Sequence, residues 1–254
     1  MHELPIEQQI LLLVEIAALL ILCIRLWRDG LSRIYPYFFV YLILQLVQTL
    51  IAVLVPLQSR LYRDLFVTSE ALIVAFDALV VVELCSVILR DLEGIARIAR
   101  RYFRITLALA FVIALLPLRL ENNTATMTGY LFAFERTVMS ILVVFVLLIS
   151  GFLVYYPVPL GRNVIVYLAG YATFFLTATT VTLINNLGYF WTRLLGGVSM
   201  GVFAVCLLFW LLMLNRQGEN KRVVVGHQWN PSDEGRLLAQ LEAINASLLR
   251  SVRK

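Results

Sequence analysis

Long apolar runs constrain this chain more than any other feature. A helix that crosses the hydrocarbon core of a bilayer needs roughly 20 mostly apolar residues. Such runs follow one another along the 254 residues at 8–26, 37–55, 64–89, 103–118, 130–155, 163–184 and 194–214. Because backbone groups cannot stay unpaired in lipid, runs of this length predict helices. We therefore expect an all-α polytopic membrane protein, a seven-transmembrane-helix bundle.

The number of spans has one weak point. The fourth run is the shortest and contains Pro117 near its end. A bundle of six spans with a re-entrant segment at this place is therefore the alternative. The first run contains Glu15 and follows no basic residue, so we expect it to remain as a transmembrane helix and not to be a cleaved signal peptide.

Composition excludes several functional classes. The chain is 61% hydrophobic and 15% charged, whereas soluble domains are nearer one half and one quarter. Its two histidines, His2 and His227, lie outside the apolar runs, so haem or metal chemistry within the membrane lacks imidazole ligands. Cys23, Cys85 and Cys206 all fall inside apolar runs and are interpreted as small core residues. No cofactor and no metal site is predicted.

Lysine and arginine are unevenly distributed between the two sides of the predicted membrane. The side that carries the C-terminal tail has 16 of them and the other side has 4. Since loops rich in positive charge stay on the cytoplasmic side, we expect the N-terminus outside and the C-terminus in the cytoplasm. This predicts a multi-pass protein of the cytoplasmic (inner) membrane. The basic charge then serves orientation and contact with anionic lipid, and no nucleic-acid partner is expected.

The chain divides into a transmembrane domain, 1–215, and a cytoplasmic tail, 216–254. Within the tail an amphipathic helix is predicted at about 232–252. Its apolar side chains recur at steps of three or four residues, and they are Leu237, Leu241, Ile244, Leu248 and Val252. Three interpretations stay open: the helix lies on the membrane surface, pairs with a second copy or another protein, or folds against the cytoplasmic loops.

Ionisable side chains at membrane depth are costly and often mark a functional site. Glu15, Glu70 and Arg136 each lie about six or seven residues from the outer end of their predicted helix, or roughly 10 Å deep. Gln48 and Thr177 come to a similar depth on helices that run the other way. We therefore expect several helices to contribute to one polar layer that opens outward.

The acids in this layer outnumber the bases. Asp77 follows Glu70 by two helical turns on nearly the same face, deeper in the bilayer. Glu135 either adds to the layer or faces the outer interface, because it cannot point the same way as Arg136. Either a carboxyl group is protonated, or a cation, an amine or water occupies the site. The structural alternative is that Arg136 pairs with Glu70 or Glu15 only to lock helices together.

Two further features have structural interpretations. Glu83, near the predicted cytoplasmic end, is expected to form an ion pair with Arg25, Arg28 or Arg101. The segment 196–201 contains a Gly-x-Ser-x-Gly pattern, but no histidine lies at membrane depth to activate the serine. Its glycines instead predict a close contact between helices. No catalytic residue is assigned.

The segment from Tyr62-Arg63-Asp64 through Glu70 to Glu83-Leu84, the basic inner loops and the amphipathic tail helix carry one resemblance. Together they resemble the seven-helix sensor regions that precede bacterial histidine kinases, and uncharacterised bacterial seven-helix membrane proteins. The resemblance covers the membrane part. Those sensor regions continue into a kinase, whereas the residues here end after the tail.

The sequence therefore favours a non-enzymatic receptor-like or accessory membrane protein that binds a small ligand. The expected pocket is lined by Glu15, Gln48, Glu70, Asp77, Arg136 and Thr177. The surface expected to contact a partner or the membrane is formed by Leu237, Leu241, Ile244 and Leu248. Expected partners are membrane lipid, a cytoplasmic or membrane protein and a second copy of the chain. The alternative function is a small-solute or proton-coupled transporter in which Asp77 or Glu70 titrates.

Overall fold

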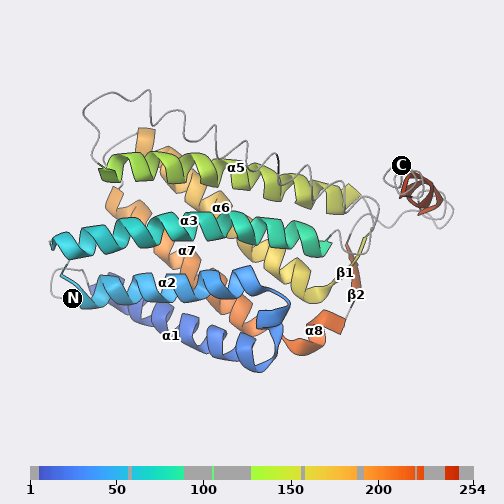
Figure 1. Ribbon diagram of the computed structural model, residues 1–254, viewed down its shortest axis with the longest axis horizontal. Helices are drawn as coiled ribbons and strands as arrows, with labels where there is room; N and C mark the ends of the chain where they lie inside the picture. Colours follow the sequence, from blue (N-terminus) through green and yellow to red (C-terminus); the bar gives the residue numbers. More distant parts are fainter. Residues whose placement is uncertain are drawn as a thin grey trace.

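The computed structural model describes residues 6–56, 59–88, 105, 127–155, 158–187, 192–220, 222–225 and 238–245. The long helices are α1 (Ile6–Arg28), α2 (Pro36–Leu54), α3 (Arg60–Ile88), α5 (Met127–Tyr155), α6 (Arg162–Leu187) and α7 (Thr192–Met213). The shorter elements are η1 (Leu31–Arg33), β1 (Val158–Gly161), α8 (Arg216–Asn220) and β2 (Arg222–Val225). In Figure 1, α1, α2, α3 and α5 run roughly along the longest axis of the molecule, and α6 and α7 run obliquely to them.

Each predicted span that falls on described residues coincides with a helix. The helices α1, α2, α3, α6 and α7 are long and apolar enough to cross a membrane. Helix α5 has 29 residues and contains the apolar stretch Thr137–Gly151. The run at 103–118 lies outside the described residues. The chain is thus a helical membrane protein, and the count of seven spans stays a prediction.

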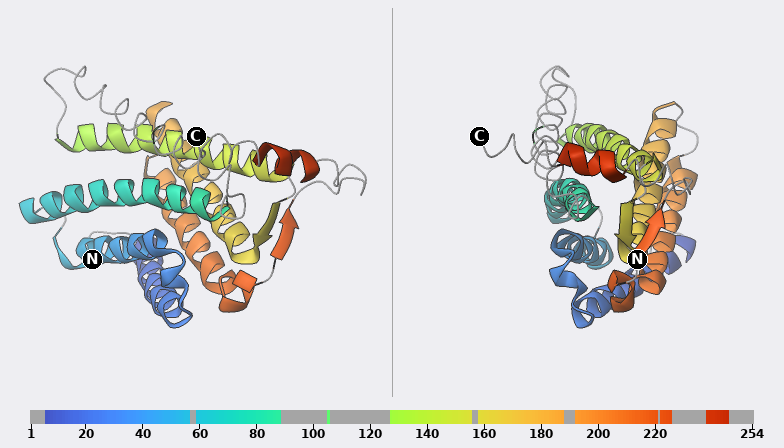
Figure 2. Two further views of the ribbon diagram at one scale, coloured as in Figure 1. Left: turned by 45° about the vertical axis from the view of Figure 1, so that its right-hand side comes forward. Right: turned by 90° about the vertical axis from the view of Figure 1, so that its right-hand side faces the viewer.

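Contacts between neighbouring helices close the described bundle into a ring. Helix α1 packs on α2, α2 on α3, α3 on α5, α5 on α6, α6 on α7, and α7 returns to α1. Viewed along the bundle, α5, α3, α2 and α1 follow one another in a curved row, with α6 and α7 on one side of it (Figure 2). A further contact between α3 and α6 crosses the ring, so α3 faces the interior of the bundle.

The two ends of the bundle differ in charge. Helices α1, α3, α5 and α7 end where α2 and α6 begin, next to α8, β1 and β2 (Figure 1). Arg25, Arg28, Arg33, Arg162 and Arg216 lie at this end, which we call the basic end. The other end, where α2 ends and α3 begins, is called the far end. How these ends lie relative to the two sides of the membrane remains a prediction.

Aromatic side chains form the core of the basic half of the bundle. Phe38 of α2 lies with its ring centroid 4.7 Å from that of Tyr167 and 5.1 Å from that of Trp210. Tyr171 of α6 lies 5.0 Å from Trp210 and 5.9 Å from Tyr41 in the same measure. All five side chains are fully buried. Their tilted and edge-to-face geometries are the ones that aromatic pairs prefer, so these rings join α2, α6 and α7.

A strand in the tail was not expected from the sequence. β2 pairs with β1 in antiparallel register, from Val158 opposite Val225 to Gly161 opposite Arg222. Three consecutive valines suit a strand because β-branched side chains favour extended backbone. A four-residue strand requires a partner, however, and here the partner lies about sixty residues earlier in the chain. The pairing ties the start of the tail to the connection between α5 and α6.

The tail helix is described over residues 238–245. This segment falls inside the predicted range of about 232–252, whose full extent stays a prediction. Leu241 is half-buried and Ile244 is 50% exposed, while Leu237 and Leu248 lie outside the described residues. The exposure of Ile244 leaves the three interpretations of the apolar face open.

Within the described residues, the glycines of α7 do not make the close contact that their spacing predicted. No atom of the described part of the chain lies within 4 Å of a Cβ built on Gly197 or Gly201. The close approach lies instead at Gly170 of α6, where a Cβ would overlap the indole ring of Trp210. Spacing of small residues permits close packing, but the rotation of each helix decides which small residues face a neighbour.

We therefore predict that Gly170→Ala destabilises the bundle. The added methyl group must displace a fully buried indole, which corresponds to overpacking and costs about 1–3 kcal/mol. Thermal unfolding of the purified protein in detergent measures the change. Gly201→Ala, at an open position of α7, is the matched control. Equal unfolding temperatures for both variants would contradict the packing of α6 on α7 described above.

Candidate functional site

Glu15 of α1 faces the interior of the bundle and contacts α2. Its side chain is buried, and Oε1 accepts a hydrogen bond from Thr49 Oγ1 at 3.3 Å. The Thr49 hydroxyl is also 2.8 Å from the backbone oxygen of Gln45, one helical turn away. The side-chain amide of Gln45 donates from Nε2 to the Tyr41 hydroxyl at 3.0 Å. A short polar chain therefore runs from Glu15 along α2 towards the aromatic core.

Glu70 of α3 meets α2 at the same level. The Gln48 side-chain amide donates to Glu70 Oε2, and both side chains are half-buried. Gln48 and Thr49 are adjacent in sequence, so α2 binds one acid on each side of itself. The structure thus brings Glu15, Gln48 and Glu70 together around the far half of α2. Whether they bind a ligand stays a prediction.

Glu135 of α5 completes an acidic group on the inner side of the bundle. It is half-buried and lies close enough to Glu70 for their charges to interact. It also acts electrostatically on Asp77. Of the two alternatives for Glu135, the structure therefore shows the one in which it adds to the layer. The side chain of its neighbour Arg136 lies outside the described part, so the pairing of Arg136 remains a prediction.

Asp77 lies deepest in the bundle and has no hydrogen-bond partner. Its side chain is 0% exposed, and neither carboxyl oxygen meets a donor within the described residues. Tyr41 of α2 and Tyr171 of α6 lie within electrostatic reach of an ionised Asp77. The Tyr171 hydroxyl is also buried without a described partner. Buried polar groups without partners are rare because the lost hydration is not replaced. The Asp77 carboxyl group and the Tyr171 hydroxyl therefore both require an explanation.

The acids have no described basic partner. The ion pairs found among the described residues are Arg25–Asp29, with 3.7 Å between Nε and Oδ2, and Arg63–Asp64, with 3.6 Å between Nε and Oδ1. Neither includes an interior acid. Thr177 lies half-buried on α6, and no described contact joins it to the acids. The described interior of the bundle therefore carries an excess of negative or potentially negative groups.

Among the described residues, Glu83 forms no ion pair with Arg25 or Arg28, and Arg101, the third predicted partner, lies outside them. Its carboxylate accepts hydrogen bonds from the backbone N–H groups of Tyr37 at 3.0 Å and Phe38 at 3.1 Å. The Tyr167 hydroxyl donates to it at 3.3 Å. Arg25, one of the predicted partners, pairs with Asp29 and donates to the backbone oxygen of Leu211.

Glu83 is therefore a cap supplied to α2 by another helix. The first peptide N–H groups of a helix lack partners within it and carry partial positive charge. The residue before α2, Tyr35, gives no side-chain cap. The carboxylate of Glu83 satisfies two of these groups and joins α3, α2 and α6 at one point. The sequence did not predict this cap, because depth along a helix does not show which neighbouring helix end a side chain meets.

The start of the tail is held by polar side chains that the sequence analysis missed. The fully buried Asn163 of α6 donates from Nδ2 to the backbone oxygen of Asn215 at 2.8 Å and to Glu219 Oε2 at 3.4 Å. The Tyr35 hydroxyl donates to the same Glu219 oxygen at 2.9 Å. Asn215 caps α8 by accepting from the Gly218 N–H at 2.6 Å. We call Tyr35, Asn163, Asn215, Gly218 and Glu219 the tail anchor.

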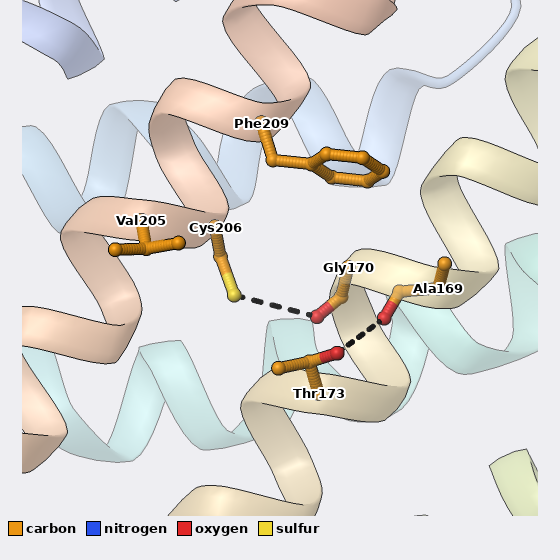
Figure 3. A pocket seen from close by; sticks show the side chains of 6 residues that line it. All are labelled: Ala169, Gly170, Thr173, Val205, Cys206 and Phe209. Carbon is orange, nitrogen blue, oxygen red and sulfur yellow. Dashed lines mark hydrogen bonds between the residues drawn. The ribbon is translucent and has the colours of Figure 1, made fainter.

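A cavity of about 220 Å³ lies between α6 and α7. Ala169, Gly170, Thr173, Val205, Cys206 and Phe209 line it (Figure 3). The Thr173 hydroxyl donates to the backbone oxygen of Ala169 at 2.9 Å, so its polar group is already satisfied. Val205 is 64% exposed, which places the opening on the outer face of the helices. This cavity is apolar, and none of the interior acids lines it.

Comparison with known proteins identified no relative. No family model, no curated protein and no solved structure matches the chain. The function is therefore argued from the geometry alone.

We predict that Glu83→Ala destabilises the protein by about 2–3 kcal/mol, because two backbone N–H groups and the Tyr167 hydroxyl lose a buried, charged acceptor. Glu83→Gln keeps one carbonyl oxygen as an acceptor and should lose less stability. Denaturant unfolding in detergent micelles, followed by tryptophan fluorescence, measures both changes. Wild-type stability of Glu83→Ala would show that this carboxylate is not the cap of α2.

Proposed function

We propose that this chain is a non-enzymatic, receptor-like or accessory membrane protein. In this proposal a small ligand binds among the acids of the far half of the bundle, and the change is passed to the tail. The observation that carries it is a series of ring contacts and hydrogen bonds from Tyr171, which lies within electrostatic reach of Asp77, to Glu219 in the first turns of the tail. The chain is taken to span the inner membrane seven times, with its N-terminus outside.

The proposed ligand carries positive charge. Glu15, Glu70 and Glu135 come from three different helices; α2 donates to Glu70 from Gln48 and to Glu15 from Thr49, and Glu135 lies within electrostatic reach of Glu70. Carboxylates gathered away from water favour a bound cation or amine because their mutual repulsion is then offset. Arg136 and Thr177 remain in the proposed pocket, where they would contact polar groups of the ligand.

The path towards the tail begins at Asp77. Its charge acts on Tyr171, whose ring lies 5.1 Å from that of Tyr167. Tyr167 bonds to Glu83, the cap of α2, and its ring lies 5.3 Å from that of Tyr35. Tyr35, which directly precedes α2, bonds to Glu219 of α8. A shift of α3 against α2 and α6 would therefore move the tail anchor.

The tail supplies the proposed output. β2 follows the tail anchor directly, and the helix at 238–245 exposes Leu238 and Ile244. Exposed apolar side chains on a basic tail fit the membrane surface, a protein partner or a second copy of the chain. Ligand binding acts on the tail only if two arrangements of the helices differ in affinity for the ligand. The unpaired state of Asp77 supports the existence of a second arrangement in which this carboxyl group finds a partner.

A proton-coupled carrier is the second candidate, and one observation favours it. Helix α3 places acids at three levels, Glu70, Asp77 and Glu83, between the far end and the basic end. Acids arranged through the depth of a bundle are typical of proton relays. A carrier would move solute across liposomes that contain no other protein, whereas a receptor would bind without flux.

The coupling between acids and tail is tested by combining two substitutions. Glu70→Gln removes a charge from the acidic layer, and we expect it to change amide hydrogen exchange in α8 and β2 by about tenfold, equivalent to ~1.4 kcal/mol. In a Tyr35→Phe background the same substitution should have no such effect, because the bond to Glu219 is absent. Hydrogen exchange followed by mass spectrometry on the full chain in lipid nanodiscs gives both results.

Tyr37→Phe is the matched control for Tyr35→Phe. Tyr37 lies two residues away and is 42% exposed, and its hydroxyl group is not part of the tail anchor. It should leave the response to Glu70→Gln intact. If Glu70→Gln leaves exchange in the tail unchanged, or changes it equally with and without the Tyr35 hydroxyl, the acids do not report to the tail through this route.

A further inference from the structure

Asp77 differs from the other interior acids in what surrounds it. Glu15 and Glu70 accept hydrogen bonds from Thr49 and Gln48, and Glu83 accepts three. Asp77 is more deeply buried than any of them and accepts none within the part of the chain that the structure describes. The site therefore lacks what a buried carboxylate requires, a donor or a positive charge.

Groups that can titrate face Asp77 from every described helix packed on α3. Glu70 precedes it on α3 itself, Glu135 faces it from α5, Tyr41 from α2 and Tyr171 from α6. Two of these groups are acids and two are neutral hydroxyl groups. No described basic side chain is among them. A single positive charge is thus the simplest ligand that this surrounding favours.

We propose that Asp77 is an exchangeable proton-binding site that is linked to the acidic layer and to the tail. This inference rests on the proposed function and names the regulation of its site. A proton requires no additional ligands and no space beyond the carboxyl group, which suits a side chain with 0% exposure. On release, the O–H bond breaks, the electron pair stays on the carboxyl oxygen and the proton passes to water.

Loss of this proton changes what Asp77 does to its neighbours. The ionised carboxyl group attracts a donor, and the Tyr171 hydroxyl is a buried donor without a described acceptor. Rotation of either side chain towards the other would move Tyr171 against the rings of Tyr167 and Trp210. Proton release is thereby connected to the aromatic core and, through Tyr167 and Glu83, to the start of α2.

The negative charge of ionised Asp77 also links it to the acidic layer formed by Glu15, Glu70 and Glu135. A negative Asp77 repels negative charge on Glu70 and Glu135 and favours a cation bound there. Binding of a cation in the layer therefore favours release of the proton, and protonation of Asp77 weakens binding of the cation by the same factor. The proton and the ligand act as mutual antagonists.

Infrared difference spectroscopy tests the proton site directly. The full chain in liposomes of neutral lipid is exchanged between mildly acidic and mildly alkaline buffers that contain only potassium salts. We expect a band of a protonated, non-hydrogen-bonded carboxylic acid at acidic pH that decreases at alkaline pH. Asp77→Asn should lose this band completely. Glu15→Gln alters a hydrogen-bonded acid of the acidic layer and should keep the band.

Three results would overturn the inference. In the first, the wild type and Asp77→Asn give identical difference spectra. In the second, the Asp77 band stays constant at every pH. In the third, the protonated band is absent at acidic pH, and the carboxylate bands of Asp77 change when sodium replaces potassium. The second result means a permanently bound proton, and the third means a metal-cation site.

Hydrogen exchange in α8 and β2 at the two pH values separates this inference from the proposed function. We expect a change that is lost in Asp77→Asn. If the band titrates while the tail is unaffected, the proton site stands and the reporting role of the tail fails. If the tail responds to Glu70→Gln but no band titrates, the reporting role stands and the proton site is wrong.

Discussion

The carboxylate of Glu83 satisfies the start of α2, and the arrangement of the basic half of the bundle depends on that interaction. Hydrocarbon offers no water to peptide groups, so the N–H groups at a helix start must find partners within the protein. Pro36 carries no N–H group, and Tyr37 and Phe38 donate to Glu83. This fixes where α2 begins against α3. It thereby sets the ring of Phe38 against α6 and α7, and the hydroxyl of Tyr35 against the tail.

Two buried acids on α3, Glu83 and Asp77, differ in whether hydrogen-bond donors satisfy them. Glu83 and Asp77 both lie on α3 and both are buried, yet Glu83 has three donors and Asp77 has no described partner. A satisfied carboxylate stabilises the fold, since removing it strands its donors. An unsatisfied one lowers stability and remains in a native structure where it contributes to function. Helix α3 thus combines an acid that caps a neighbouring helix with one whose carboxyl group has no described donor.

The sequence predicted the depth of the polar side chains better than their partners. Gln48 and Glu70 meet, and Glu15 binds Thr49 next to Gln48, as their depths suggested, because rise per residue converts position in a span into depth. Among the described residues, Glu83 caps α2 and does not pair with Arg25 or Arg28, and no close neighbour is found at Gly197. Both differences have one cause, since depth and spacing along one helix contain no information about the rotation of its neighbours. The anchoring of the tail at Asn163 was missed for the same reason, because its partners lie more than fifty residues away.

The amino-acid sequence by itself determined that this chain is a helical membrane protein, where its described spans lie, and that acids line several of them. These properties follow from hydropathy and from helix geometry, which are local. Only the tertiary structure decided that Glu135 faces inward, that Asp77 is left without a described partner, and that Glu219 is held by Tyr35. Those outcomes depend on which helices are neighbours and how each is rotated about its axis. Complementary packing of the aromatic core and pairing of buried polar groups select that arrangement among many that the same apolar runs would allow.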